Sequence, residues 1–151
     1  MNAQLRNGQQ VVNYDCVQTV RLYANAITAA GADECTCVNC KNFAAQRTKG
    51  YPETFLALLN QVGVDPMKEL EAFDYDFGVE KAGHLYGGWF VFCGQLVEGI
   101  DWRPERRSGL FTYWFTNSFP SSQLPNVSLC AIEFCVELPW VIPESDSAPH
   151  R

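Results

Sequence analysis

The chain has 151 residues, of which 47% are hydrophobic and 13% aromatic, and its formal net charge is −6. This length and composition predict a globular protein with a packed core and exclude a disordered chain. The excess of 17 acidic over 11 basic residues disfavours binding to nucleic acid or to an anionic membrane. We therefore expect a protein or a small molecule as the partner.

The first ten residues hold no apolar run typical of a signal peptide, and no stretch of about 18 residues is continuously apolar. We expect a cytoplasmic protein on this basis. The chain has seven cysteines. In a reducing compartment they are expected as metal ligands or buried thiols, because disulfides do not persist there.

Helical periodicity dominates the first half of the chain. The first predicted helix follows Asp15, a typical N-cap residue, and ends before Gly31. Its predicted apolar stripe consists of Val17, Val20, Ala24 and Ile27. A short second helix is expected from Cys40 to about Lys49. The third begins near Pro52 and ends at Gly63, with an apolar stripe formed by Phe55, Leu56, Leu59 and Val62.

From Phe73 onward the pattern changes to that of β-strands, with predicted strands near 84–97, 110–117 and 127–141. The simplest topology for them is an antiparallel meander. Segregated helices and strands predict an α+β domain over residues 1–143, in which N-terminal helices pack on one face of a C-terminal antiparallel sheet. Residues 144–151 are expected to form a flexible tail. Gly87 and Gly88 inside a strand indicate a bulge or a close backbone approach.

Three cysteines lie within one short segment: Cys35, Cys37 and Cys40. Zinc prefers four tetrahedral ligands, and a tight Cys-x-Cys-x-x-Cys turn can direct three sulfurs to one point. Cys40 is expected at a helix N-terminus, where the helix dipole and free amides stabilise a thiolate. We therefore predict that these three residues bind zinc between two helices.

The segment 35–43, Cys-Thr-Cys-Val-Asn-Cys-Lys-Asn-Phe, resembles the zinc-binding element of tRNA-guanine transglycosylases, which carry C-x-C-x-x-C-K-N-[YF] leading into a helix. In that family a downstream histidine completes the site, whereas residues 41–83 here contain none. The family's chemistry needs a (β/α)₈ barrel of roughly 250 residues, so base exchange on tRNA is not implied. More loosely, the whole chain resembles small bacterial proteins of no assigned function, which share this segment, a strand like 86–90 and an ending like 137–141.

The fourth zinc ligand is left open by the sequence. His84 ranks first, because imidazole completes Cys₃His sites, and Cys16 near the start of the first helix ranks second. Cys93, Cys130 and Cys135 lie in predicted strands, where cysteines usually behave as small buried apolar residues. Cys135 stays a weaker candidate, since strand alternation places it on the same face as two glutamates.

Two functions fit this pattern. The first is a non-catalytic binding or interaction module with a structural Cys₃-X zinc site. The alternative is a thiol-disulfide redox enzyme that uses Cys37 and Cys40, which have dithiol spacing. The absence of a predicted strand of a thioredoxin-like βαβ unit before the dithiol favours the first function.

Two charged clusters complete the candidates. The carboxylates of Asp74, Asp76 and Glu80 near His84 are compatible with an acid-base group or an oxygen-rich metal site. The loop that contains Trp102, Arg103, Arg106 and Arg107 is compatible with a phosphate or base clamp. We expect both clusters to be solvated surface.

Overall fold

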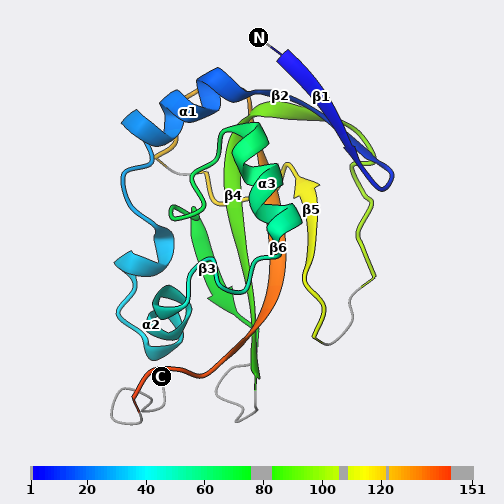
Figure 1. The fold of residues 1–151 in the computed structure, drawn as a ribbon. Helices are drawn as coiled ribbons and strands as arrows, with labels where there is room; N and C mark the ends of the chain where they lie inside the picture. The colour runs from blue at the N-terminus through cyan, green and yellow to red at the C-terminus, as the bar shows by residue number, and fades with distance from the viewer. Residues whose placement is uncertain (1, 76–82, 106–108, 122, 144–151) are drawn as a thin grey trace.

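The structure is a computed structural model, and it describes residues 2–75, 83–105, 109–121 and 123–143. Its elements are β1 (Asn2–Asn7), β2 (Gln10–Asp15), α1 (Cys16–Asn25), the 3₁₀ helix η1 (Gly31–Glu34), α2 (Val38–Ala45), α3 (Glu53–Val62), β3 (Glu71–Asp74), β4 (Gly83–Glu98), β5 (Thr112–Thr116) and β6 (Leu129–Pro139). The predicted α+β class is confirmed. Figure 1 shows α3 across one face of the sheet, with η1 and α2 beside β3.

All strand pairs of the described sheet are antiparallel, in the order β1-β2-β4-β6-β5, while β3 pairs with β4 off this path. The predicted meander is wrong, because β6 inserts between β4 and β5. The two longest strands pair along residues 83–93 of β4 and 129–139 of β6. Placing them side by side at the centre buries their apolar residues most completely and leaves the short β5 outside.

The N-terminal hairpin was not expected, since only helices are predicted in this half. Its six-residue register runs from Asn2 opposite Asp15 to Asn7 opposite Gln10, and Gly8 turns the chain at a φ of 58°. The residues of β1 are mostly exposed and polar. A strand that buries so little has no clear apolar alternation to reveal it.

Gln10, at the start of β2, is fully buried and connects this strand to the far edge of the sheet. Its side-chain Nε2 donates to the Phe115 carbonyl at 2.7 Å, and its Oε1 accepts from the Phe115 amide at 2.8 Å. The Asn7 side chain donates to the Tyr113 carbonyl at 3.4 Å. Side-chain amides therefore satisfy edge groups of β5 that have no neighbouring strand.

The main core lies between the sheet and the helices and is dominated by aromatic rings. Phe55 of α3 lies 6.2 Å from Phe90 of β4 and 6.2 Å from Phe134 of β6, as measured between ring centroids. Tyr51 lies 5.3 Å from Phe134 in an edge-to-face contact. The third predicted helix is confirmed by α3, which ends at Gly63 with a φ of 96°.

The predicted apolar stripe of α1 is wrong at three positions: Val17 and Val20 are each 53% exposed, and Ala24 is exposed as well. Asp15 does cap the helix, because its side chain accepts from the Gln18 amide at 3.0 Å. The buried residues of α1 are Thr19, Leu22 and Tyr23. The helix therefore turns a partly polar face towards the sheet.

The backbone of β4 explains this orientation of α1. β3 pairs with residues 86–89 of β4, and β2 pairs with residues 94–98, so neither strand covers 90–93. The Tyr23 hydroxyl donates to the Val91 carbonyl at 2.7 Å, and the Cys93 amide donates to the Thr19 hydroxyl at 3.0 Å. Because buried backbone groups need partners, the hydroxyl face of α1 is favoured over the valine face.

The close approach predicted at Gly87 and Gly88 is confirmed. A Cβ on Gly87 would lie 2.4 Å from the Phe73 ring, and one on Gly88 would lie 2.6 Å from the Phe134 ring. Both glycines therefore leave room for aromatic side chains, one on each face of the sheet.

Candidate metal centre

The cysteine segment connects η1 to α2, and a thiol caps the helix. α2 begins at Val38 rather than at Cys40, and it ends at Ala45 rather than near Lys49. The Cys37 sulfur accepts from the Cys40 amide at 3.4 Å, the role that an oxygen plays at most N-caps. Cys40 thus lies inside the first turn, as the third residue of the helix rather than the first.

The three sulfur atoms of Cys35, Cys37 and Cys40 all lie within 4.8 Å of one another. The Cys35 and Cys37 sulfurs are 3.3 Å apart, and the Cys35 thiol donates to Cys37. Around a tetrahedral zinc ion with Zn–S bonds of about 2.3 Å, sulfurs are separated by about 3.8 Å. Shifts of about 1 Å or less would therefore give the spacing that zinc requires, so the residues fit the metal.

Burial differs among the three thiols and affects their protonation. Cys35 is exposed, whereas Cys37 and Cys40 are half-buried. Hydrogen bonds lower the pKa of Cys35, chiefly the one from the Cys37 amide. Burial raises the pKa of Cys40, and its hydrogen bonds to the two other thiols raise it further. Cys35 therefore accommodates a negative charge more readily than Cys40 does.

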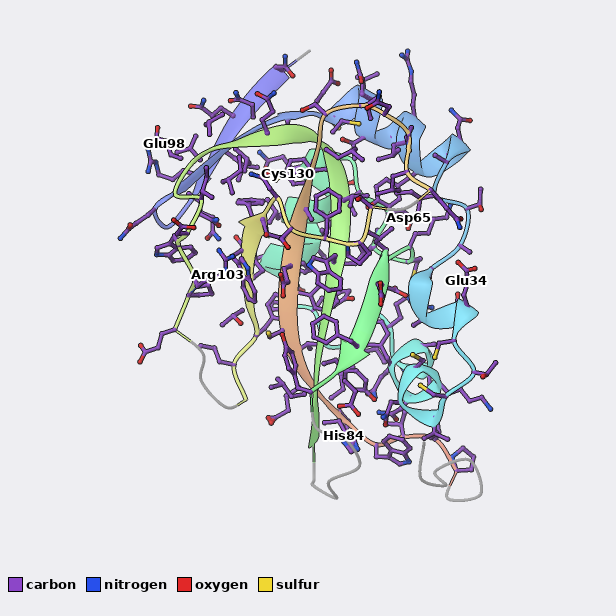
Figure 2. All side chains as sticks on the ribbon, turned by 180° about the vertical axis from the view of Figure 1, so that it is seen from behind. Glu34, Asp65, His84, Glu98, Arg103 and Cys130 are labelled. Carbon is purple, nitrogen blue, oxygen red and sulfur yellow. The ribbon has the colours of Figure 1, made fainter. Side chains whose placement is uncertain are left out.

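The structure brings the three cysteines together, and among the described residues no fourth donor atom joins their group. His84 lies at the lower end of β4, apart from the yellow sulfur atoms on α2 (Figure 2). Its ring is 4.9 Å from that of Trp140, its side chain is buried, and its Nδ1 has no hydrogen-bond partner among the described residues. His84 as the fourth ligand stays a prediction.

The four other cysteines lie outside this group, and all seven are free thiols. Cys16 is half-buried at the start of α1, whereas Cys93, Cys130 and Cys135 are buried in strands as predicted. Burial raises the pKa of Cys130 to about 12. Cys135 lies 3.7 Å from the Tyr75 hydroxyl, and strand alternation places it on the sheet face opposite Phe134 and the helices.

Asn42 and Phe43, which follow the last ligand, attach α2 to the sheet. The Asn42 side chain donates to the Tyr86 hydroxyl and to the Pro139 carbonyl, both at 3.1 Å, and it accepts from the Val141 amide at 2.8 Å. The Tyr86 hydroxyl donates to the Asn39 carbonyl within the cysteine segment at 2.9 Å. These motif residues thus fix the helix on which Cys40 lies.

An ionic cluster that the sequence analysis missed lies beside the cysteine segment. The Arg47 Nε donates to Glu69 Oε1 at 2.7 Å, and its terminal nitrogen donates to Glu69 Oε2 at 2.9 Å and to Asp33 at 3.0 Å. Glu69 is fully buried, and the Arg47 side chain is 7% exposed. We call Asp33, Arg47 and Glu69 the Glu69 cluster. Their sequence separations carry no local pattern that would have revealed it.

The other charged candidates are only partly described. Asp74 ends β3, whereas Asp76 and Glu80 lie outside the described residues, as do Arg106 and Arg107. The Arg103 guanidinium lies 5.8 Å from the Trp114 ring centroid and donates to the Ile100 and Trp102 carbonyls. Its contacts are therefore within the protein.

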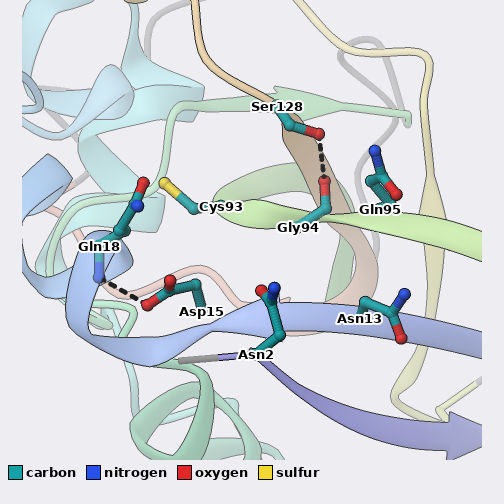
Figure 3. A pocket seen from close by; sticks show the side chains of 8 residues that line it. All are labelled: Asn2, Asn13, Asp15, Gln18, Cys93, Gly94, Gln95 and Ser128. Atoms are coloured by element: carbon teal, nitrogen blue, oxygen red, sulfur yellow. Dashed lines mark hydrogen bonds between the residues drawn. The ribbon is translucent and has the colours of Figure 1, made fainter.

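Two cavities are lined by none of the three clustered cysteines. One, of about 290 Å³, is lined by Asn2, Asn13, Asp15, Gln18, Cys93, Gly94, Gln95 and Ser128 (Figure 3). The other, of about 350 Å³, lies between α1 and α3. Two polar side chains of the first cavity bond locally: the Ser128 hydroxyl donates to the Gly94 carbonyl at 3.1 Å, and Asp15 accepts from the Gln18 amide, a contact that lowers its pKa.

Comparisons with protein-family models, with curated proteins and with solved structures each found no match. Within the described ranges, none of the helices has the length and apolar character needed to cross a membrane. What the chain does is therefore inferred from the arrangement of the Cys35, Cys37 and Cys40 sulfurs.

Proposed function

We propose that this chain is a small non-catalytic binding module in which Cys35, Cys37 and Cys40 hold a structural zinc ion. The convergence of their three sulfurs within 4.8 Å carries the proposal. Thiolates are soft ligands that suit zinc and disfavour magnesium or calcium. When bound, zinc would supply a cross-link between the end of η1 and the first turn of α2.

A structural role follows from where the sulfurs lie. They occupy a junction between two short helical segments, whereas neither cavity includes any of them. In structural sites the free energy of metal binding contributes to folding, on the order of 10 kcal/mol in small zinc peptides. Here the aromatic core supplies independent stability, so we expect the metal to order the η1–α2 region rather than the whole chain.

For the fourth ligand we keep His84 as the first candidate and Cys16 as the second. Along β4, His84 is two residues from Tyr86, so both side chains are on the sheet face that α2 covers. An imidazole nitrogen without a partner is available to a metal, and the buried Nδ1 of His84 has none. Binding would require the ring to leave Trp140.

The redox alternative is less well supported, because Cys40 is a poor candidate for a thiolate. A thiol that attacks a disulfide must be a thiolate, and burial raises the pKa of Cys40. As a partner for the module we infer a protein or a small molecule rather than nucleic acid or a membrane, in keeping with the net charge of −6.

The test is metal analysis of the full chain purified under reducing conditions without chelator. We expect about one zinc ion per chain, and Cys37→Ser should lose the metal and lower the melting temperature. Cys130→Ala is the matched control, because it removes a buried strand thiol and should retain zinc. A metal-free wild-type protein with no zinc affinity would overturn the proposal, and disulfide reduction by that protein would support the redox alternative.

A further inference from the structure

We propose that Arg47 and Glu69 are positioning residues of the metal centre, which hold the two flanks of the cysteine segment at the separation that metal binding requires. This inference rests on the proposed zinc function. It assigns a task to the Glu69 cluster, which no motif in the sequence explains.

Glu69 contacts both sides of the cysteine segment. On the side before it, the Glu69 backbone carbonyl accepts from the Gly31 amide at 2.8 Å, and Oε2 accepts from the Ala32 amide at 3.0 Å. On the side after it, both carboxylate oxygens accept from Arg47, which follows α2 by two residues. One carboxylate thus joins η1 to the far end of α2.

Two further contacts close this connection. Arg47 also reaches Asp33 of η1 at 3.0 Å, which makes a second link across the segment. At Gly31 an added Cβ would lie 2.3 Å from the Leu70 carbonyl oxygen, so η1 packs directly against the chain next to Glu69. Residues 35–40 are therefore a short connection between two fixed ends.

The burial of the Glu69 cluster argues for a geometric role. Moving a carboxylate and a guanidinium out of water is costly, and apolar pairs of similar volume often give equal or greater stability. The exposed pair Arg6–Glu98, with 3.8 Å between nitrogen and oxygen and side chains that are 61% and 63% exposed, pays no such cost and fixes no segment. A bidentate arginine–carboxylate pair fixes the relative orientation of its two side chains, which apolar packing does not do.

The contacts of Arg47 and Glu69 would favour metal binding because they hold the cysteine segment in place before the metal binds. All three thiols must lose their protons to bind the metal, and the resulting thiolates repel one another, so a loose segment would spread them apart. Holding both flanks reduces the conformational entropy that is lost when they converge. Residues that orient metal ligands from outside typically change affinity by 10- to 100-fold when they are replaced.

The test compares zinc affinity with stability in matched variants. Arg47→Lys keeps the charge and removes the two-pronged geometry, and Glu69→Gln keeps the shape and removes the charge. Affinity is measured by competition with a chromophoric chelator, and the melting temperature is measured in excess chelator. We expect both variants to bind zinc about 10-fold or more weakly than wild type. Val62→Ala, a fully buried change in α3, should lower the melting temperature and leave affinity unchanged.

Cobalt spectra and amide exchange supply readouts that a general loss of stability would not move. In Arg47→Lys we expect a shifted visible band of the cobalt-loaded protein and faster exchange of the Ala32 amide in the metal-free protein. Wild-type zinc affinity in both variants, or an equal loss of affinity in Val62→Ala, would overturn the inference. If Glu69→Gln fails to fold, Asp33→Asn replaces it, with the loss of one link and a smaller decrease in affinity. Failure of the wild type itself to bind zinc would instead count against the proposed function.

Discussion

The sheet face that the helices cover has two parts, one around α3 and one around η1 and α2. Different forces hold these two parts together. Around α3, rings such as Phe55, Phe90 and Phe134 pack against one another and need no specific direction. Around η1 and α2, the Glu69 cluster, the Asn42 amide and the three thiols act through directed contacts. Apolar burial can sustain the first part alone, whereas the second depends on complete sets of partners and, in our proposal, on a metal.

The largest expected effect comes from breaking the aromatic part. Phe90→Ala removes a fully buried ring in β4 and should lower the free energy of unfolding by about 3–5 kcal/mol, because it leaves a cavity. Urea unfolding with and without chelator measures the loss. Val97→Ala, at a site that is 43% exposed, is the control and should change stability by less than about 0.5 kcal/mol. A Phe90 variant that loses stability only after chelation would contradict the independence of the two parts.

An intermediate effect is expected from removal of the metal, which should loosen the part around η1 and α2. Chelation of the zinc-loaded protein should raise amide exchange in residues 31–45 by at least about 10-fold, because the segment loses its cross-link. Amides of the β4–β6 ladder should show a much smaller increase, because the aromatic core keeps them protected. Mass spectrometry of exchanged peptides checks both statements, and a uniform rise across the chain would show that the metal stabilises the whole fold.

The smallest expected effect concerns Glu133, which is partly buried, in contrast to the fully buried Glu69. Glu69 has three donors, whereas Glu133 on the opposite sheet face accepts from the Trp89 indole at 3.0 Å. Burial raises the pKa of Glu133, and the bond from Trp89 and the charge of Arg103 oppose this only in part.

A raised carboxyl pKa means that the folded state holds the proton more tightly than the unfolded state. The contribution of Glu133 to stability is therefore absent below its ordinary pKa and becomes unfavourable as pH rises through the folded value. We expect Glu133→Gln to gain stability relative to wild type between about pH 4.5 and pH 7, by less than about 1 kcal/mol because the side chain is half-exposed. Urea titrations across this range measure the difference, and a relative loss on raising the pH would contradict the assigned direction.

The sequence predicts those features that depend on local signals. α3 is bounded by Pro52 and Gly63, and Asp15 caps α1, because both ends of a helix leave characteristic residues. The cysteine group is predicted for the same reason, since its three residues lie within the short segment 35–40.

The remaining features depend on contacts between distant residues. Arg47 and Glu69 lie on either side of α3 in the sequence and meet only in the folded chain, and the hydroxyl face of α1 is selected by the backbone groups of β4 that it pairs with. The position of β6 between β4 and β5 likewise follows from the pairing of the two longest strands. Periodicity in the first half of the chain contains none of this information.

The amide of Gln10 has a consequence for how the molecule behaves in a crowded solution. An unpaired outer strand is a template on which a second chain can add, and repeated addition leads to aggregates. At Phe115 that template is already occupied by a side chain that imitates a peptide group. Replacing Gln10 would leave the Phe115 amide and carbonyl without these partners, and we expect the variant to self-associate more readily than the wild type.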